Sequence, residues 1–123
     1  MAPATRVLIV DDEKDITSSL KLGLAHKGFT VDVYNDPVDA LAIYKPGTYD
    51  LIILDIRMPK MNGFEFFREV KKVDESVKVC FLTAFEVYTD EFKRLFPNMK
   101  IEGFLRKPIT ISELATQIEK ITG

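Results

Sequence analysis

Residues 51–54, Leu-Ile-Ile-Leu, form a continuous apolar run that ends at an acidic residue, Asp55. The run does not alternate apolar with polar side chains, and this is typical of a strand that is covered on both faces. It belongs to a series of short runs rich in β-branched residues, which lie near 6–10, 30–34, 50–54, 77–82 and 101–105. We therefore expect a sheet whose middle strand ends at a carboxylate.

Stretches with helical signals separate these runs. Residues 14–27 repeat apolar side chains every four positions and stop at Gly28. A second helix is expected from Asp36-Pro37, with Asp36 as the N-cap and an apolar stripe of Val38, Leu41, Ala42 and Tyr44. A third covers roughly 64–72, a loosely patterned fourth starts at about 89, and a fifth begins with a capping-box pattern from Thr110 to Glu113.

The alternation of strands and helices predicts an α/β fold with right-handed crossovers and an open parallel sheet. Ligands bind such sheets outside the carboxyl ends of the strands. Four charged residues stand at those ends, namely Asp11, Asp12, Asp55 and Lys107. Because close carboxylates repel unless a cation compensates them, this pattern predicts a divalent-metal site with a nucleophile inside it.

Composition limits the other function classes. The 123 residues suit a single domain over 1–123, with a core of about 5–122, and the 46% hydrophobic content suits a packed interior. The net charge of −2 does not favour nucleic-acid binding. The chain has one cysteine, Cys80, no signal-peptide pattern and no apolar run near the roughly 18 residues that a membrane span needs. We expect a cytoplasmic protein that binds neither membranes nor DNA.

The chain resembles response-regulator receiver domains, the phospho-acceptor modules of two-component signalling. The resemblance covers essentially the whole chain and rests on separated signatures at the expected strand ends. It implies a flavodoxin-like sheet in the order 2-1-3-4-5 with helices on both faces. The signatures are Val-Asp-Asp-Glu at 10–13, Leu-Asp-Ile-Arg-Met-Pro at 54–59, Met-Asn-Gly at 61–63, Leu-Thr-Ala at 82–84 and Lys-Pro at 107–108.

The acidic residues divide into an acceptor and metal ligands. An aspartate can attack phosphorus to give an acyl phosphate, and Asp55 follows the middle strand, so it is the predicted phospho-acceptor. Mg²⁺ prefers hard oxygen ligands, which Asp12 and Asp55 would supply, with Asp11 binding directly or through water. The resemblance adds the backbone carbonyl of Arg57 as a ligand. Mn²⁺ is the alternative ion.

Three further residues complete the predicted site. Lys107 is a flexible point charge suited to a phosphoryl oxygen, Thr83 offers a hydroxyl donor, and Ala84 leaves room for the phosphoryl group. The resemblance implies that Thr83 then moves toward this group and that Phe104, on the fifth strand, turns inward. The shift would remodel the face formed by the fourth helix, fifth strand and fifth helix.

These residues predict a phosphorylation-activated signalling switch that assists only its own phosphorylation and dephosphorylation. The expected donors are a sensor histidine kinase, a phosphotransfer protein or a small phosphodonor. The expected outputs are a protein target that binds the remodelled face and a phosphorylation-dependent homodimer. Two alternatives stay open: a Mg²⁺-dependent aspartyl-phosphate phosphatase, which would place its nucleophile after the first strand in an Asp-x-Asp pattern, and a receiver that binds proteins without being phosphorylated.

Other interpretations accompany some of these residues. Asp11 or Asp12 could cap the helix that follows them. A second hypothesis makes Phe85, Tyr88, Phe92 and Phe96 an aromatic interaction surface. The resemblance further suggests that Arg57 and Phe85 influence the lifetime of the phosphorylated state, and that Pro108 follows a cis peptide bond.

Overall fold

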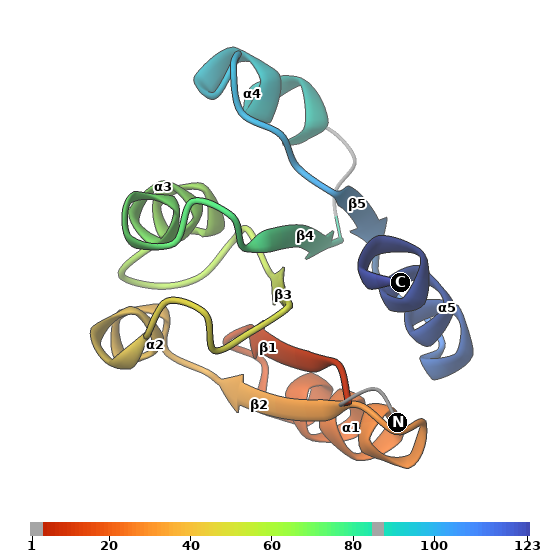
Figure 1. Ribbon diagram of the computed structural model, residues 1–123. Coiled ribbons are helices and arrows are strands. Elements are labelled where there is room, and N and C mark those ends of the chain that lie inside the picture. The colour runs from red at the N-terminus through yellow and green to blue at the C-terminus, as the bar shows by residue number, and fades with distance from the viewer. Residues whose placement is uncertain (1–3, 85–87) are drawn as a thin grey trace.

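The computed structural model of the chain describes residues 4–84 and 88–123, in which strands and helices alternate (Figure 1). The strands are β1 (Arg6–Val10), β2 (Thr30–Tyr34), β3 (Leu51–Leu54), β4 (Lys78–Thr83) and β5 (Gly103–Arg106). The helices are α1 (Lys14–His26), α2 (Pro37–Ile43), α3 (Gly63–Val73), α4 (Tyr88–Leu95) and α5 (Ile111–Thr122). None of these helices has the length and apolar content that a membrane crossing requires.

The strands form one parallel sheet in the order β2-β1-β3-β4-β5, which confirms the predicted fold class. In Figure 1 helices α2, α3 and α4 cover one face of the sheet, and α1 and α5 cover the other. β3 lies between β1 and β4, with Leu54 opposite both Val10 and Phe81. The carboxyl ends of these three strands therefore lie at one edge of the sheet, where β4 continues for two residues beyond Phe81.

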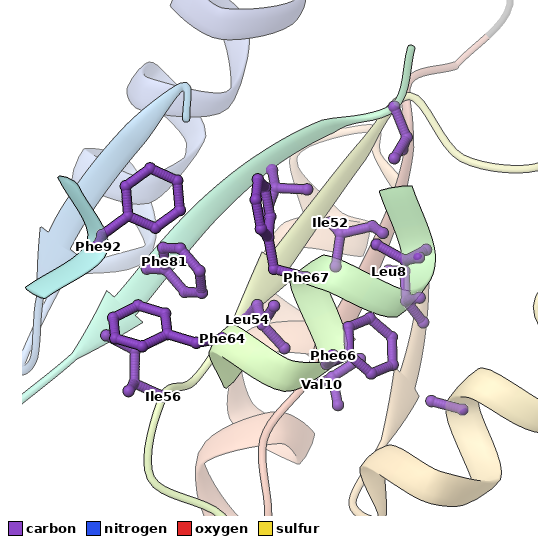
Figure 2. Packing of buried hydrophobic residues seen from close by; sticks show 14 residues of the cluster. Leu8, Val10, Ile52, Leu54, Ile56, Phe64, Phe66, Phe67, Phe81 and Phe92 are labelled. Carbon is purple, nitrogen blue, oxygen red and sulfur yellow. The ribbon is translucent and has the colours of Figure 1, made fainter. Parts of the chain in front are cut away.

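The sheet separates two apolar cores. Side chains of β1, β3 and β4 alternate between the two, so Leu8 and Ile52 face α2 and α3 whereas Val7 and Ile53 face α1 and α5. All four residues of β3 are at most 1% exposed, which explains why this strand is apolar throughout. Figure 2 shows the first core, in which the phenylalanines of α3 pack on the sheet.

This first core also includes Phe92 and Phe96, two of the aromatic residues that were predicted to form a surface. Phe92 is 2% exposed, and its ring centroid lies 5.2 Å from those of Phe67 and Phe96. Phe96 is half-buried against the same cluster. The predicted surface is therefore wrong for these two residues, because Phe92 on α4 packs against β4 and α3, and Phe96, directly after α4, packs against α3. Phe85 and the side chain of Tyr88 lie outside the described residues.

Most helix starts follow the sequence signals. Asp36 caps α2 by accepting hydrogen bonds from the N–H groups of Val38 and Asp39, and Thr110 and Glu113 form the capping box of α5. The apolar stripe predicted for α2 is partly wrong, since Val38 and Ala42 are exposed and Pro37 and Ala40 are buried. The helix ends at Ile43, and Tyr44 has extended backbone, so the helical period does not continue as far as the prediction assumed.

Candidate metal centre and its lysine

The ends of β1 and β3 place two carboxylates side by side. The backbone N–H of Asp55 donates to the carbonyl of Val10 at 3.0 Å, and the N–H of Asp11 donates to Tyr34 at 3.1 Å. Each aspartate thus continues the hydrogen-bond pattern of the sheet one residue beyond its strand. Their side chains are held where the sheet ends, as the sequence predicted.

Gly63 fixes the loop that follows Asp55. Its N–H donates to the carbonyl of Ile56 at 2.7 Å, which brings the start of α3 against the end of β3. A Cβ atom at Gly63 would overlap the backbone carbonyl oxygen of Asp55. The residue must therefore be glycine for α3 to begin this close to the acidic site. Asn62 and Glu65 stabilise the same helix start with a capping box.

Three carboxylates meet at this edge. Oxygen atoms of Asp11, Asp12 and Asp55 all lie within 4.8 Å of one another. Asp11 is 2% exposed and Asp55 is 7% exposed, so neither negative charge is well solvated. Burial, followed by the charge of Asp11, raises the pKa of Asp55 to about 6, although Lys107 acts in the opposite direction. Such a set of close oxygen donors fits a hard divalent cation such as Mg²⁺.

Lys107 supplies a positive charge from the end of β5. Its Nζ lies 2.6 Å from Asp11 Oδ2, 3.1 Å from Glu13 Oε1 and 3.6 Å from Asp55 Oδ2, and its side chain is only 12% exposed. Burial by itself would lower the pKa of Lys107, but the hydrogen bond to Asp11 and the charges of Asp55 and Asp11 raise it overall. The backbone N–H of Lys107 donates to the carbonyl of Thr83 at 2.8 Å, and a cis peptide bond joins Lys107 to Pro108, as expected.

The remaining predicted residues lie on β4, on β5 and in the loops that follow β3 and β4. Thr83, the last residue of β4, is 4% exposed, and the next residue, Ala84, is exposed and small. Arg57 is exposed and begins the loop after Ile56. Phe104 on β5 is half-buried, with its ring stacked on Phe81 at a centroid distance of 5.2 Å. This ring, which was expected to turn inward on phosphorylation, thus already contacts the core.

Two polar residues near the acids were given no role from sequence. Asn35 donates from Nδ2 to the backbone carbonyl of Asp11 and to Thr17 Oγ1, each at 2.9 Å. Glu13, rather than Asp11 or Asp12, is the N-cap of α1, so the capping alternative for that pair is wrong. The Glu13 side chain makes no capping hydrogen bond and contacts Lys107 instead. For Glu13 the only signal in the sequence was a glutamate at a position that Ser, Thr, Asp or Asn usually occupies.

A family model and curated relatives match nearly the whole of this chain. A family model described as a response regulator receiver domain matches residues 7–119. The chain is 34% identical over 113 residues to the transcriptional regulatory protein DltR of Streptococcus agalactiae, covering 92% of this chain and 50% of DltR. It is 31% identical over 116 residues to the transcriptional regulatory protein CusR of Escherichia coli, covering 94% and 50%. The chain thus spans about half the length of these curated relatives.

Two solved structures are also similar to this chain over nearly its whole length. The response regulator TrrA of Thermotoga maritima, in complex with Mg²⁺-BeF, is 32% identical with a TM-score of 0.82, over 95% of this chain and 98% of TrrA. The chemotaxis protein CheY4 of Vibrio cholerae is 28% identical with a TM-score of 0.84, over 96% of this chain and 98% of CheY4.

Proposed function

This chain belongs to the response-regulator receiver family, and we propose that it is a phosphorylation-activated switch of two-component signalling whose acceptor is Asp55. The observation that carries the proposal is the position of the Asp55 carboxylate, which lies within 4.8 Å of the acids that follow β1 and 3.6 Å from the ammonium of Lys107. A nucleophile, an oxygen-rich cation site and a buried cation at one sheet edge together suit phosphoryl transfer, which depends on positioning and charge stabilisation.

The transfer is a displacement at phosphorus. An Asp55 carboxylate oxygen forms the new O–P bond while the bond from phosphorus to the donor breaks, and the donor leaves with that electron pair. Asp11, Asp12, Asp55 and the backbone carbonyl of Arg57 would hold Mg²⁺, which would offset the negative charge of both the carboxylates and the phosphoryl group. TrrA, which was solved with Mg²⁺-BeF, supports this choice of ion, and Mn²⁺ is a substitute of similar ligand preference.

Three residues of this chain then stabilise the phosphoryl oxygens or make room for them. Lys107 donates from its ammonium to one oxygen, and the Thr83 hydroxyl donates to another. Ala84 leaves the approach to Asp55 open because its side chain is a single methyl group. Thr83 and Ala84 stand at or just past the end of β4, which neighbours β3, and Lys107 stands just past the end of β5, on the other side of β4.

We further propose that the switch acts on the face formed by α4, β5 and α5. Thr83 moves toward the phosphoryl group, and Phe104 responds through its contacts with Phe81 and Phe92, at 5.2 and 5.7 Å. Phenylalanine lacks the hydroxyl of a tyrosine, so only the packing of this ring can report the change. A protein target, or a second copy of the chain, would bind the altered face.

The donor is a sensor histidine kinase or a phosphotransfer protein, and a small phosphodonor can replace it. A surface groove of about 790 Å³ between α1 and the start of α5 opens beside Lys107, and Ser19 lies on it. We propose that the donor protein binds there. Ser19→Arg should then slow transfer from a phosphorylated donor protein and leave labelling by acetyl phosphate unchanged. The chain assists only its own phosphorylation and dephosphorylation.

Intact-mass measurement tests the assignment of Asp55. We expect one phosphoryl adduct after incubation with Mg²⁺ and acetyl phosphate, no adduct in Asp55→Asn, and none when a chelator removes the ion. Asp50→Asn is the matched control, because Asp50 precedes β3 at the opposite edge of the sheet and pairs with Arg6. An adduct that persists in Asp55→Asn, or sustained turnover of a phosphomonoester, would contradict the proposal.

A further inference from the structure

Glu13 holds a position whose side chain would ordinarily stabilise the helix that follows. N-cap residues are usually Ser, Thr, Asp or Asn, because a short side chain can accept a hydrogen bond from the first N–H groups of the helix. Glu13 is the N-cap of α1 and makes no such bond. Its carboxylate reaches across to β5 instead, where Oε1 lies 3.1 Å from Lys107 Nζ. Glu13 thus contacts a residue of the proposed functional site instead of capping its own helix, which is the kind of local exception expected at such sites.

Three carboxylates lie close to the Lys107 ammonium. An ammonium has three N–H donors, and three acids surround this one, with Asp11 at 2.6 Å, Glu13 at 3.1 Å and Asp55 at 3.6 Å. The nitrogen therefore lies closer to Glu13 than to the acceptor Asp55. A phosphoryl oxygen carried by Asp55 is a new anionic acceptor, and binding it draws Lys107 away from one of its present partners.

Glu13 is the partner that is released at the lowest cost. Asp11 is held by a shorter contact, accepts the N–H of Glu13 at 3.0 Å, and has a side chain that is 3% exposed. The Glu13 side chain is 56% exposed, so water solvates its carboxylate once the lysine has left. We propose that Glu13 is a positioning residue that holds Lys107 in the unphosphorylated state and competes with the phosphoryl group for it. This inference rests on the proposed function.

Competition between Glu13 and the phosphoryl group for Lys107 predicts whether the affinity for a phosphoryl mimic rises or falls when Glu13 is changed. Removing the charge of Glu13 should strengthen binding of the phosphoryl mimic beryllofluoride in saturating Mg²⁺, by about two- to fivefold, as expected for a solvent-exposed ion pair. The gain should shrink in high salt, which screens exposed charges. A residue that only stabilised the fold would produce the opposite sign or no change.

The experiment compares Glu13→Gln with Asp15→Asn in the whole chain. Asp15 is the exposed acid of the first turn of α1, so its substitution removes one charge from the same helix end. Beryllofluoride is titrated in both variants and in the unsubstituted protein, and the change is followed by tyrosine fluorescence. We expect tighter binding in Glu13→Gln only. Unchanged or weaker binding there, or an equal gain in Asp15→Asn, would overturn the proposal.

The ¹⁵N resonance of the Lys107 ammonium gives a second readout. Glu13→Gln should shift it in the protein without beryllofluoride, and the two proteins should give the same resonance once the mimic is bound. A difference that persists with beryllofluoride means that Glu13 is not released. The phosphorylation assay separates the two proposals, since an unsubstituted protein that takes no phosphoryl group on Asp55 refutes the proposed function itself.

Discussion

The ammonium of Lys107 lies 3.6 Å from the carboxylate of Asp55, across the carboxyl ends of two strands that are not neighbours in the sheet. The two residues are far apart in sequence and directly follow β3 and β5, which have β4 between them. The contact makes Lys107 an internal counter-cation for a group of carboxylates that would otherwise repel one another. The ammonium therefore lies next to the place where a divalent ion or a phosphoryl group would bind.

Loss of this lysine should therefore affect stability and metal binding in opposite directions. In Lys107→Gln the carboxylates of Asp11 and Asp55 lose their cation, and we expect the free energy of unfolding of the metal-free protein to fall by about 1–3 kcal/mol. Mg²⁺ should bind more tightly, because no resident cation opposes it. Urea denaturation and isothermal titration measure the two effects.

A second ion pair provides the control for Lys107. Lys60 pairs with Asp36 at 2.7 Å, but its side chain is 65% exposed. Lys60→Gln should therefore change stability by less than about 1 kcal/mol and leave the affinity for Mg²⁺ nearly unaltered. Equal effects of the two substitutions would contradict the role given to Lys107.

The raised pKa of Asp55 predicts how stability depends on pH. The folded protein holds this pKa at about 6, against 3.8 for the ordinary carboxyl, chiefly through burial. Between these values the folded state binds a proton that the unfolded state lacks, so stability falls as pH rises toward 6 and stays reduced above it. Asp55→Asn removes that cost, and should stabilise the metal-free protein at pH 7.5 by on the order of 1–3 kcal/mol.

The advantage of Asp55→Asn should disappear on acidification, because near pH 4 the carboxyl of the unsubstituted protein is protonated in the folded state. Denaturation in urea at the two pH values, with a chelator present, gives the comparison. Asp50→Asn should stay within about 1 kcal/mol of the unsubstituted protein at both, since its partner Arg6 is exposed. A constant advantage of Asp55→Asn across this range would contradict the raised pKa.

The sequence predicted the parts of the fold that depend on local pattern. The apolar run of β3, the stop at Gly28, the Asp36 cap and the capping box at Thr110 are each visible in neighbouring residues, and the structure has all of them. The acids and the lysine came together for a related reason, since parallel strands bring all their carboxyl ends to one edge.

Features that depend on side-chain direction were missed. The burial of Phe92 was missed, because α4 is a short helix and its packing against β4 and α3 decides which side chains enter the first core. Likewise, the contact of Glu13 with Lys107 joins residues 94 positions apart, and a long side chain can turn to either its own helix or a neighbour. Such choices are decided by tertiary packing rather than by spacing along the chain.

The close approach of Gly63 to Asp55 predicts a strong effect of a single methyl group. In Gly63→Ala the new Cβ would overlap the carbonyl oxygen of Asp55, so α3 and the end of β3 must separate. We expect a loss of about 1–3 kcal/mol in the free energy of unfolding, as for other overpacked sites. Because the displaced backbone carries the proposed acceptor, Asp55, labelling by acetyl phosphate should also slow.

Gly103→Ala tests whether this loss is specific to Gly63. A Cβ at Gly103 would lie 3.5 Å from Cys80 Sγ, an ordinary contact, so its stability should change by less than about 1 kcal/mol. Similar losses in both variants would mean that the approach of α3 to Asp55 is not under steric control.

Burial of Phe92 separates a core role from a surface role for the aromatic residues of α4. Phe92 is 2% exposed and contacts the rings of Phe64, Phe67, Phe81 and Phe104. Phe92→Ala should therefore destabilise the fold by about 3–5 kcal/mol, as in other cores that lose a phenylalanine. Leu95→Ala, on the same helix but 55% exposed, should cost less than about 1 kcal/mol. Thermal and urea denaturation measure both, and a Phe92→Ala protein of normal stability would restore the surface hypothesis.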